Sequence, residues 1–301
     1  MKAAEVTAWG DAPQYSTVPD PVLPDPSSGQ IQIKVQAAAL HQVVRARALG
    51  KHYSAKTLPH IPGTDGCGVT SEGQAVYFNS MAVGGASFAE RVNVPKEQVF
   101  PLPQGLDPIK AAAFANPALS SWMGLKYRTV DLPKNFTALI VGASSTSGIL
   151  AISVARHFGA GKVYGAARSL SKLEGLDLDK AFALDEYKDL GDVDVILDYV
   201  YGDAVSALFE ALPSGRPIQY VQIGALGGTA ALIDGGLLRS KNITVRGAGP
   251  GAYDLRSIKD EMPDILVAVN KSSSTAYETH KLSEVTAAWN KRSGDRIVII
   301  P

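Results

Sequence analysis

The chain has 301 residues, of which 46% are hydrophobic and 19% charged, and its 29 basic and 29 acidic residues give a formal net charge of zero. This length is sufficient for two domains with separate cores. A balanced charge provides no field that would attract nucleic acid or an anionic membrane, so we expect neither as a partner. The single cysteine, Cys67, excludes a disulfide within the chain and favours a reducing compartment. With no signal-like N-terminus and no apolar run of about 20 residues, we expect a soluble, cytoplasmic protein.

The first 115 or so residues have the composition of a β-rich module. Residues 30–38 alternate apolar and polar side chains, which is typical of a strand with one buried face. Short strands separated by Gly and Pro turns favour a small barrel. We expect strands at residues 2–8, 30–38, 66–70, 74–78 and 87–94, and a helix at 41–49.

The stretch 137–168 organises the rest of the chain. An apolar run at 138–141 is short enough for a buried strand, and a turn of small residues follows at 142–148. Helical spacing of apolar residues comes next, and a second strand over 162–166 leads to residue 168. This strand–turn–helix–strand unit predicts the first half of a dinucleotide-binding fold. Strands and helices continue to alternate beyond it, which predicts a parallel sheet covered on both faces.

The turn 142–148 has the chemistry of a phosphate site. A helix N-terminus presents free N–H groups and the positive end of its dipole to an anion. Gly142 and Gly148 would let the backbone approach a pyrophosphate, and the residues between them add hydroxyl groups. The spacing is Gly-x-x-Ser-x-x-Gly rather than the strict Gly-x-Gly-x-x-Gly, so the alternative is a plain tight turn. The surrounding strands and helix favour nucleotide binding.

The end of the second strand indicates which dinucleotide binds. An NAD site usually has an acidic residue about 20 residues after the glycines, where it bonds the ribose 2′-hydroxyl. Here Ala167 and Arg168 stand at that place, followed by Ser169 and Lys172. A guanidinium group binds phosphate with paired N–H donors, and only NADP(H) carries a 2′-phosphate. We therefore expect NADP(H) rather than NAD(H). The alternative is that Arg168 and Lys172 form an ordinary solvated helix start.

Other catalytic motifs are missing. A structural zinc lobe of four thiolates is impossible with one cysteine, and no metal-binding His or Cys spacing occurs, so we expect no metal. Neither a Gly-x-Ser-x-Gly elbow nor a Walker phosphate loop is present.

Taken together, these pieces resemble the medium-chain dehydrogenase/reductase superfamily, and within it the zinc-free quinone oxidoreductase branch. The matching segments run almost the whole length of the chain: VQAAALHQVVRARALGKHY at 35–53, LPHIPGTDGCG at 58–68, GGASFAERVNVP at 84–95, AAAFANPALSSWMGL at 111–125, the VGASSTSG turn, VILDYVYG at 195–202, QIGALGG at 222–228 and the terminal GDRIVIIP.

The resemblance implies an α/β protein of two domains. A GroES-like β-barrel catalytic domain would comprise residues 1–117 and 256–301, and a Rossmann domain with a doubly wound parallel sheet would comprise residues 118–255. It further implies NADP(H) in a cleft between the domains, hydride transfer from its nicotinamide, and a homodimer.

The resemblance also shows where this chain departs from the family. Zinc-dependent relatives have Cys near the position of His41, His near Thr64 and a second Cys near Leu119, and none of these residue types is kept. Quinone reductases usually have Asn where this chain has His41. That histidine could donate a proton, line the pocket or be structural. Tyr53 resembles a tyrosine that many relatives place beside the nicotinamide, and Ser145 replaces the usual middle glycine of the turn.

Carried over position by position, the resemblance assigns most of the cofactor site. The turn Gly142, Ala143, Ser144, Ser145, Thr146 and Ser147 would face the pyrophosphate. The 2′-phosphate would be held by Arg168, Ser169 and Lys172. The remaining contacts would come from Tyr199 and Val200 near adenine or ribose, from Ile223, Gly224, Ala225, Gly247, Ala248 and Gly249 near the nicotinamide ribose, and from Lys291 or Arg292 at the phosphates.

The expected activity is zinc-independent reduction of a quinone or an α,β-unsaturated carbonyl by NADPH. Such acceptors need no Lewis acid, because the negative charge spreads to a carbonyl oxygen that a donor or water can protonate. His41 and Tyr53 are the candidate catalytic residues, since both can stabilise or protonate that oxygen. Two alternatives remain open: an enoyl-thioester reductase of a biosynthetic pathway, and a catalytically silent NADPH-binding protein.

Overall fold

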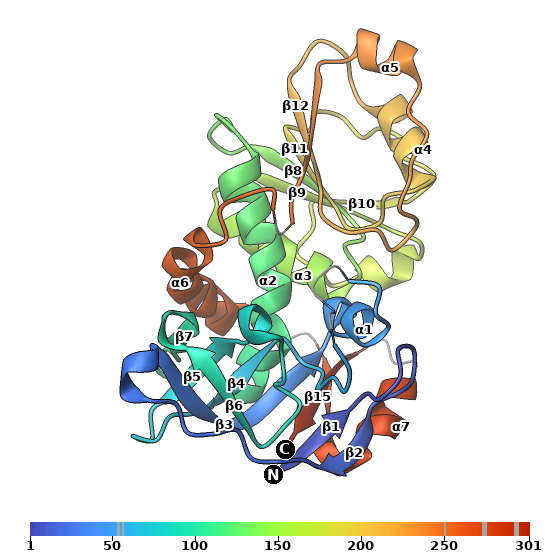
Figure 1. Ribbon diagram of the computed structural model, residues 1–301. Helices are drawn as coiled ribbons and strands as arrows, with labels where there is room; N and C mark the ends of the chain where they lie inside the picture. Colours follow the sequence, from blue (N-terminus) through green and yellow to red (C-terminus); the bar gives the residue numbers. More distant parts are fainter. Residues whose placement is uncertain (53–54, 56, 250, 273–275, 292–294) are drawn as a thin grey trace. The chain divides into compact units, whose positions relative to one another are not determined.

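The computed structural model describes residues 1–52, 55, 57–249, 251–272, 276–291 and 295–301 (Figure 1). The chain forms two compact units. Unit 1 comprises Met1–Asn116 and Glu261–Pro301, and unit 2 comprises Pro117–Asp260. These limits lie within five residues of the domain boundaries expected from the sequence. No helix in the described ranges is both long and apolar enough to cross a bilayer.

Unit 1 is built on a mostly antiparallel seven-stranded sheet in the order β14-β15-β3-β4-β5-β7, with β6 also paired to β3. The central strand β3 buries alternate residues, as the sequence pattern predicts. The last strand, β15, pairs with β3, which confirms that the chain end returns to the first module. The strands are β3 (Gln30–Leu40), β4 (Asp65–Val69), β5 (Ala75–Asn79), β6 (Arg91–Pro95), β7 (Val99–Pro101), β14 (Tyr277–Lys281) and β15 (Arg296–Ile300).

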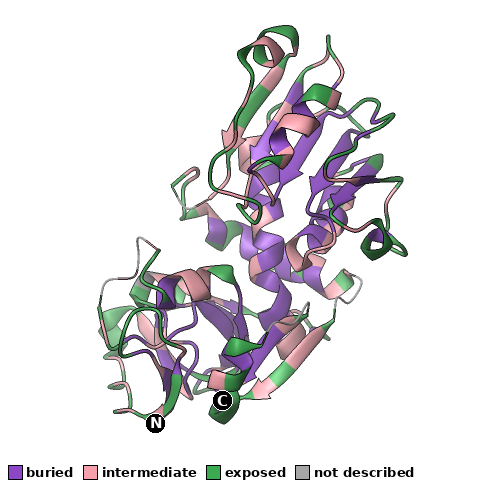
Figure 2. Cartoon of the chain, turned by 90° about the vertical axis from the view of Figure 1, so that its right-hand side faces the viewer, coloured by how far each residue is buried: buried purple, intermediate pink, exposed green. Residues whose placement is uncertain are grey.

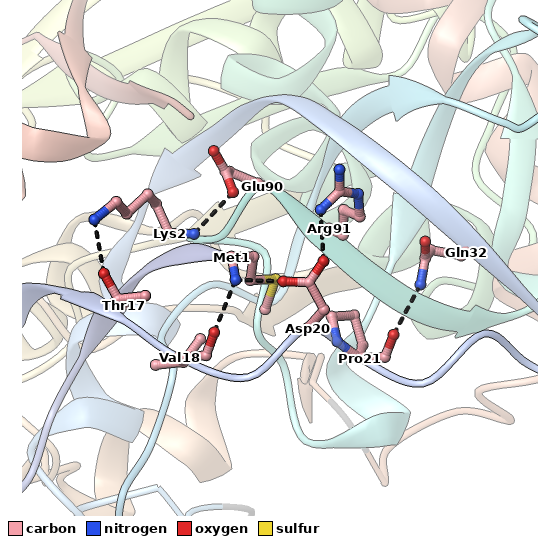
Figure 3. Close-up of polar contacts among 9 residues, drawn as sticks. All are labelled: Met1, Lys2, Thr17, Val18, Asp20, Pro21, Gln32, Glu90 and Arg91. Carbon is pink, nitrogen blue, oxygen red and sulfur yellow. Dashed lines mark hydrogen bonds and ion pairs between the residues drawn. The ribbon is translucent and has the colours of Figure 1, made fainter.

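A separate hairpin lies in the same unit, formed by β1 (Lys2–Glu5) and β2 (Gln14–Thr17). Polar contacts attach the hairpin, and the residues 18–21 that follow it, to the larger sheet (Figure 3). The α-amino group of Met1 donates to the Val18 carbonyl at 2.8 Å and pairs with Asp20, whose other oxygen accepts from Arg91 of β6 at 2.9 Å. The strand β2 was not predicted from the sequence, because its exposed, polar residues carry no apolar alternation.

Unit 2 contains a parallel six-stranded sheet in the order β10-β9-β8-β11-β12-β13. This is the doubly wound 3-2-1-4-5-6 order of a Rossmann domain. Figure 2 shows the strands of this sheet mostly buried. All five residues of β8 are buried, as expected for a strand covered on both faces. The strands are β8 (Thr137–Val141), β9 (Lys162–Ala167), β10 (Lys180–Ala183), β11 (Val195–Asp198), β12 (Ile218–Gln222) and β13 (Ile243–Gly247).

The helices account for the rest of the regular structure. The sequence predicts a helix that opens at residues 109–114 and continues after Pro117 over 118–127, and α2 runs unbroken from Pro108 to Arg128 with Pro117 inside it. In this helix Ser120 and Ser121 donate to the carbonyls of Pro117 and Ala118. The other helices are α1 (Gln42–Ala48), α3 (Thr146–His157), α4 (Ala204–Ala211), α5 (Gly235–Ser240), α6 (Ser257–Lys271) and α7 (Val285–Asn290).

Candidate functional site

The carboxyl ends of the parallel strands in unit 2 form the first part of the candidate site. The strands β8 and β11 pair with each other although they are not consecutive in the sequence, and the strand order reverses between them. Helix α3 follows β8, and helix α4 follows β11. Ligands of doubly wound sheets bind outside the carboxyl ends of the strands at such a point. Five predicted cofactor segments follow β8, β9, β11, β12 and β13, and the parallel sheet therefore brings them to one edge.

The turn after β8 allows a very close approach of backbone to backbone. Gly142 has a φ of +89°, a conformation that favours glycine, and its N–H donates to Ala166 of β9 at 2.8 Å. A Cβ atom on Gly148 would lie 2.2 Å from the Gly142 carbonyl oxygen. Both predicted glycines are therefore sterically required, and helix α3 starts directly against the end of β8.

Ser145 is the N-cap of α3. Its hydroxyl accepts from the Gly148 N–H at 3.1 Å and donates to the Gly142 carbonyl at 2.8 Å. The sequence interpretation of this hydroxyl as a free donor for phosphate is therefore wrong, because the helix cap already uses it. The amides of Ser144, Thr146 and Ser147 have no acceptor in the part of the chain that the structure describes. They remain available to an anion at this helix start.

The end of β9 carries the predicted cationic group. Arg168 and Lys172 are both exposed, and neither forms an ion pair with a described residue. Ser169 is half-buried, and its hydroxyl lies 2.9 Å from that of Ser171. The place that an NAD site reserves for a carboxylate is thus held by a guanidinium with unused N–H donors.

The loop after β11 is held by a buried carboxylate. One oxygen of Asp198 accepts from the Val200 and Tyr201 amides at 2.7 and 3.0 Å, and the other accepts from the Tyr220 hydroxyl. Burial raises the pKa of Asp198, against the opposing effect of these hydrogen bonds. Tyr199, predicted near adenine or ribose, is only 4% exposed, and burial raises its pKa to about 12. The side chain of Tyr199 is therefore packed inside unit 2 rather than exposed at this edge.

The loops after β12 and β13 are fixed by backbone contacts and one arginine. The amides of Ile223 and Gly224 both donate to the backbone carbonyl of Asp198, and a Cβ on Gly224 would lie 2.7 Å from the Tyr199 carbonyl oxygen. Arg128, at the end of α2, donates to the carbonyls of Gly247 at 2.8 Å and Ala252 at 2.7 Å. No local pattern predicts Arg128 as part of this site, because its acceptors are more than one hundred residues away.

Unit 1 holds a second group of functional residues. His41 and Asp65 are 5% and 0% exposed, and the His41 Nε2 lies 2.6 Å from an Asp65 oxygen. The hydroxyls of Tyr77 and Thr64 also donate to Asp65, at 2.8 and 3.0 Å. Residue types alone do not predict this pairing, because they carry no information on which distant parts of the chain come into contact.

No family model matches the chain, but individual proteins do. It is 32% identical, over the full length of both proteins, to a "probable NADPH-dependent quinone reductase" of Emericella nidulans. The chain belongs to the quinone oxidoreductase branch of the medium-chain dehydrogenase/reductase superfamily. A 2-methylene-furan-3-one reductase of Solanum lycopersicum is also 32% identical, across 66% of this chain and 57% of that enzyme. Among solved structures, the quinone oxidoreductase of Thermus thermophilus matches with a TM-score of 0.79 at 25% identity, covering all of both chains.

Two predicted residues of this quinone oxidoreductase-like chain, Tyr53 and Arg292, lie outside the described residues. Lys291, the alternative to Arg292, forms an ion pair with Glu278 of β14. Within the described ranges, no three His, Cys, Asp or Glu side chains gather as a metal site. At two of the positions that hold zinc ligands in the zinc-dependent relatives, this chain has His41 and Thr64. Both of these residues hydrogen-bond to Asp65.

Replacing Ser145 by alanine should destabilise the protein by about 1 kcal/mol, because α3 loses its N-cap. The free energy of unfolding, measured in urea for wild type and variant, checks this. Ser144→Ala is the matched control, since the Ser144 hydroxyl makes no hydrogen bond with the described residues. Equal stability of the two variants would show that the cap contributes nothing.

Proposed function

We propose that this protein is an NADPH-dependent, zinc-independent oxidoreductase that transfers hydride to a quinone or an α,β-unsaturated carbonyl. The observation that carries the proposal is the exposed Arg168 at the end of β9, which forms no ion pair with a described residue, in a chain whose full-length relative is named an NADPH-dependent quinone reductase. A relative in Arabidopsis thaliana named as an NADPH-dependent alkenal/one oxidoreductase supports the second class of acceptor.

The residues of unit 2 fit the cofactor. The steric cradle of Gly142 and Gly148 and the unpaired amides of Ser144, Thr146 and Ser147 suit a pyrophosphate. Arg168, with Ser169 and Lys172, suits a 2′-phosphate. The backbone at 223–225 and 247–249 is positioned at the same sheet edge to hold the remaining ribose. When bound, NADPH supplies the hydride.

The protein's own contribution is to orient the reactants and manage the proton. Reduction of a quinone or enone leaves negative charge on an oxygen, which needs a proton. We propose His41 as the donor, with Tyr53 as a second candidate. Zinc-independence is supported by the residue types at the family's zinc positions, His41, Thr64 and Leu119, which do not form the zinc-dependent set.

We propose a cytosolic homodimer. The strand β13 is at the edge of the sheet, with Thr244 and Val245 exposed. The N–H group of Ala248 donates to Gln222 of β12. Because N–H groups point to opposite sides at successive residues of a strand, the N–H group of Val245 points away from the sheet. An edge strand that pairs with only one other strand among the described residues can pair with a second copy. The buried free thiol of Cys67 is in keeping with a reducing compartment.

Purified protein should oxidise NADPH when a quinone or an enone is added, as measured by loss of absorbance of the reduced nicotinamide. The panel should include simple quinones, alkenals and enones, and enoyl thioesters. Turnover confined to the thioesters would indicate a biosynthetic enoyl reductase instead. Tight NADPH binding without turnover of any acceptor would indicate a silent binding protein and contradict the proposal.

Replacing Arg168 by alanine should raise the Kd for NADPH at least about tenfold and leave the Kd for NADH nearly unchanged, because only NADPH has the 2′-phosphate. Titration calorimetry with both cofactors measures this. Lys162→Ala is the matched control, since it removes an exposed cation from the opposite end of the same strand. An equal effect of Arg168→Ala on both cofactors would refute the assignment.

Val245→Pro should convert the dimer to a monomer. Proline removes the outward N–H and leaves the hydrogen bonds to β12 intact, so the strand still forms. Light scattering after size-exclusion chromatography gives the mass, with Val245→Thr as a control that keeps the N–H. A wild-type monomer, or a Val245→Pro variant that remains dimeric, would show that this edge is not the interface.

A further inference from the structure

The buried pair of His41 and Asp65 has a defined origin in the fold of unit 1. His41 directly follows β3 and precedes α1, and Asp65 begins β4. The strands β3 and β4 pair in antiparallel register, which brings the end of β3 close to the start of β4. The Nε2–Oδ1 distance of 2.6 Å is that of a short, charge-assisted hydrogen bond.

The surroundings of Asp65 favour its charged form. Burial opposes ionisation, but the facing His41 and the hydroxyls of Tyr77 and Thr64 outweigh it and hold the pKa of Asp65 below its usual value. Burial raises the pKa of the Tyr77 phenol and of the Cys67 thiol, so both neighbours are neutral. Arg296 of β15 adds a positive charge, because burial lowers its pKa only to about 10.

A carboxylate at this distance requires a hydrogen on the ring nitrogen that faces it. The Nε2 of His41 therefore keeps its proton in both the neutral ring and the imidazolium, and Nδ1 is the nitrogen that gains and loses one. Its other nitrogen, Nδ1, is buried and has no hydrogen-bond partner among the described residues. Buried polar atoms are rarely left unpaired, and this one belongs to a ring whose other nitrogen is already fixed by Asp65.

We propose that Asp65, itself oriented by Tyr77 and Thr64, is a positioning residue that fixes the His41 tautomer and directs Nδ1 to deliver the proton of the reaction. The proposal rests on the proposed function. Hydride addition leaves an oxyanion on the acceptor. The Nδ1–H bond of the imidazolium breaks as the new O–H bond forms, and His41 becomes neutral while its Nε2–H stays on Asp65. A proton from solvent restores the imidazolium.

The test replaces Asp65 by asparagine, which keeps the size of the side chain and removes its charge. An amide can donate to Nε2, so the neutral ring would then carry its proton on Nδ1. We expect kcat with the quinone to fall at least about tenfold while KM for NADPH is unchanged. Asp107→Asn is the matched control, because it makes the same chemical change at an exposed carboxylate that does not contact His41.

Nitrogen NMR of protein labelled with ¹⁵N-histidine provides a readout that needs no turnover. We expect the wild type to show His41 protonated on Nε2, and the Asp65→Asn variant to show the other tautomer. If Asp65→Asn does not fold, Tyr77→Phe tests the same set of contacts, with an expected fall in kcat of about two- to fivefold and a shifted Nε2 resonance.

The outcomes separate the two proposals. An unchanged kcat in Asp65→Asn, or a wild-type His41 protonated on Nδ1 alone, overturns the positioning role. A fall in thermal stability with unchanged kcat assigns Asp65 a structural role only and also overturns it. If the wild type reduces no acceptor, the proposed function fails and proton delivery fails with it, while the NMR spectrum still tests the tautomer assignment.

Discussion

The contact between the end of β8 and the start of α3 is the constraint on which the cofactor site depends. Gly148 approaches the Gly142 carbonyl so closely that no side chain fits between them. This contact fixes the direction of α3, and with it the unpaired amides at its first turn. Because those amides are backbone groups, the residues between the glycines can vary as long as they are small and one of them caps the helix. Ser145 meets that requirement in place of the family's usual glycine.

The two units use different chemistry. Unit 2 presents mostly backbone groups at one sheet edge, with the exposed Arg168 as the charged side chain that we propose distinguishes between cofactors. Asp198 and Arg128 hold the neighbouring loops by hydrogen bonds to backbone amides and carbonyls. Unit 1 instead places ionisable side chains in a buried cluster, where His41 and Asp65 pair. A buried pair of this kind is costly unless its hydrogen bonds are satisfied, and the unpaired Nδ1 is the exception within that pair.

Prediction from sequence worked best where the signal was local. The apolar run of β8, the small-residue turn and the cationic end of β9 follow one another within about 30 residues, so strand, helix and cofactor preference could be inferred together. It failed for β2, whose exposed residues have no period. The hydroxyl of Ser145 was misassigned because the sequence does not distinguish a serine with a free hydroxyl from a serine that caps a helix.

Patterns along the chain were sufficient to infer the order of the elements, the Rossmann topology and the residue types at the cofactor edge, because these depend on periodicity and on steric needs of single positions. Which distant groups meet became apparent only once the chain was folded. The contacts of His41 with Asp65, and of Arg128 with Gly247, join residues from different elements. Strand register and helix packing select these partners, and no local pattern encodes that selection directly.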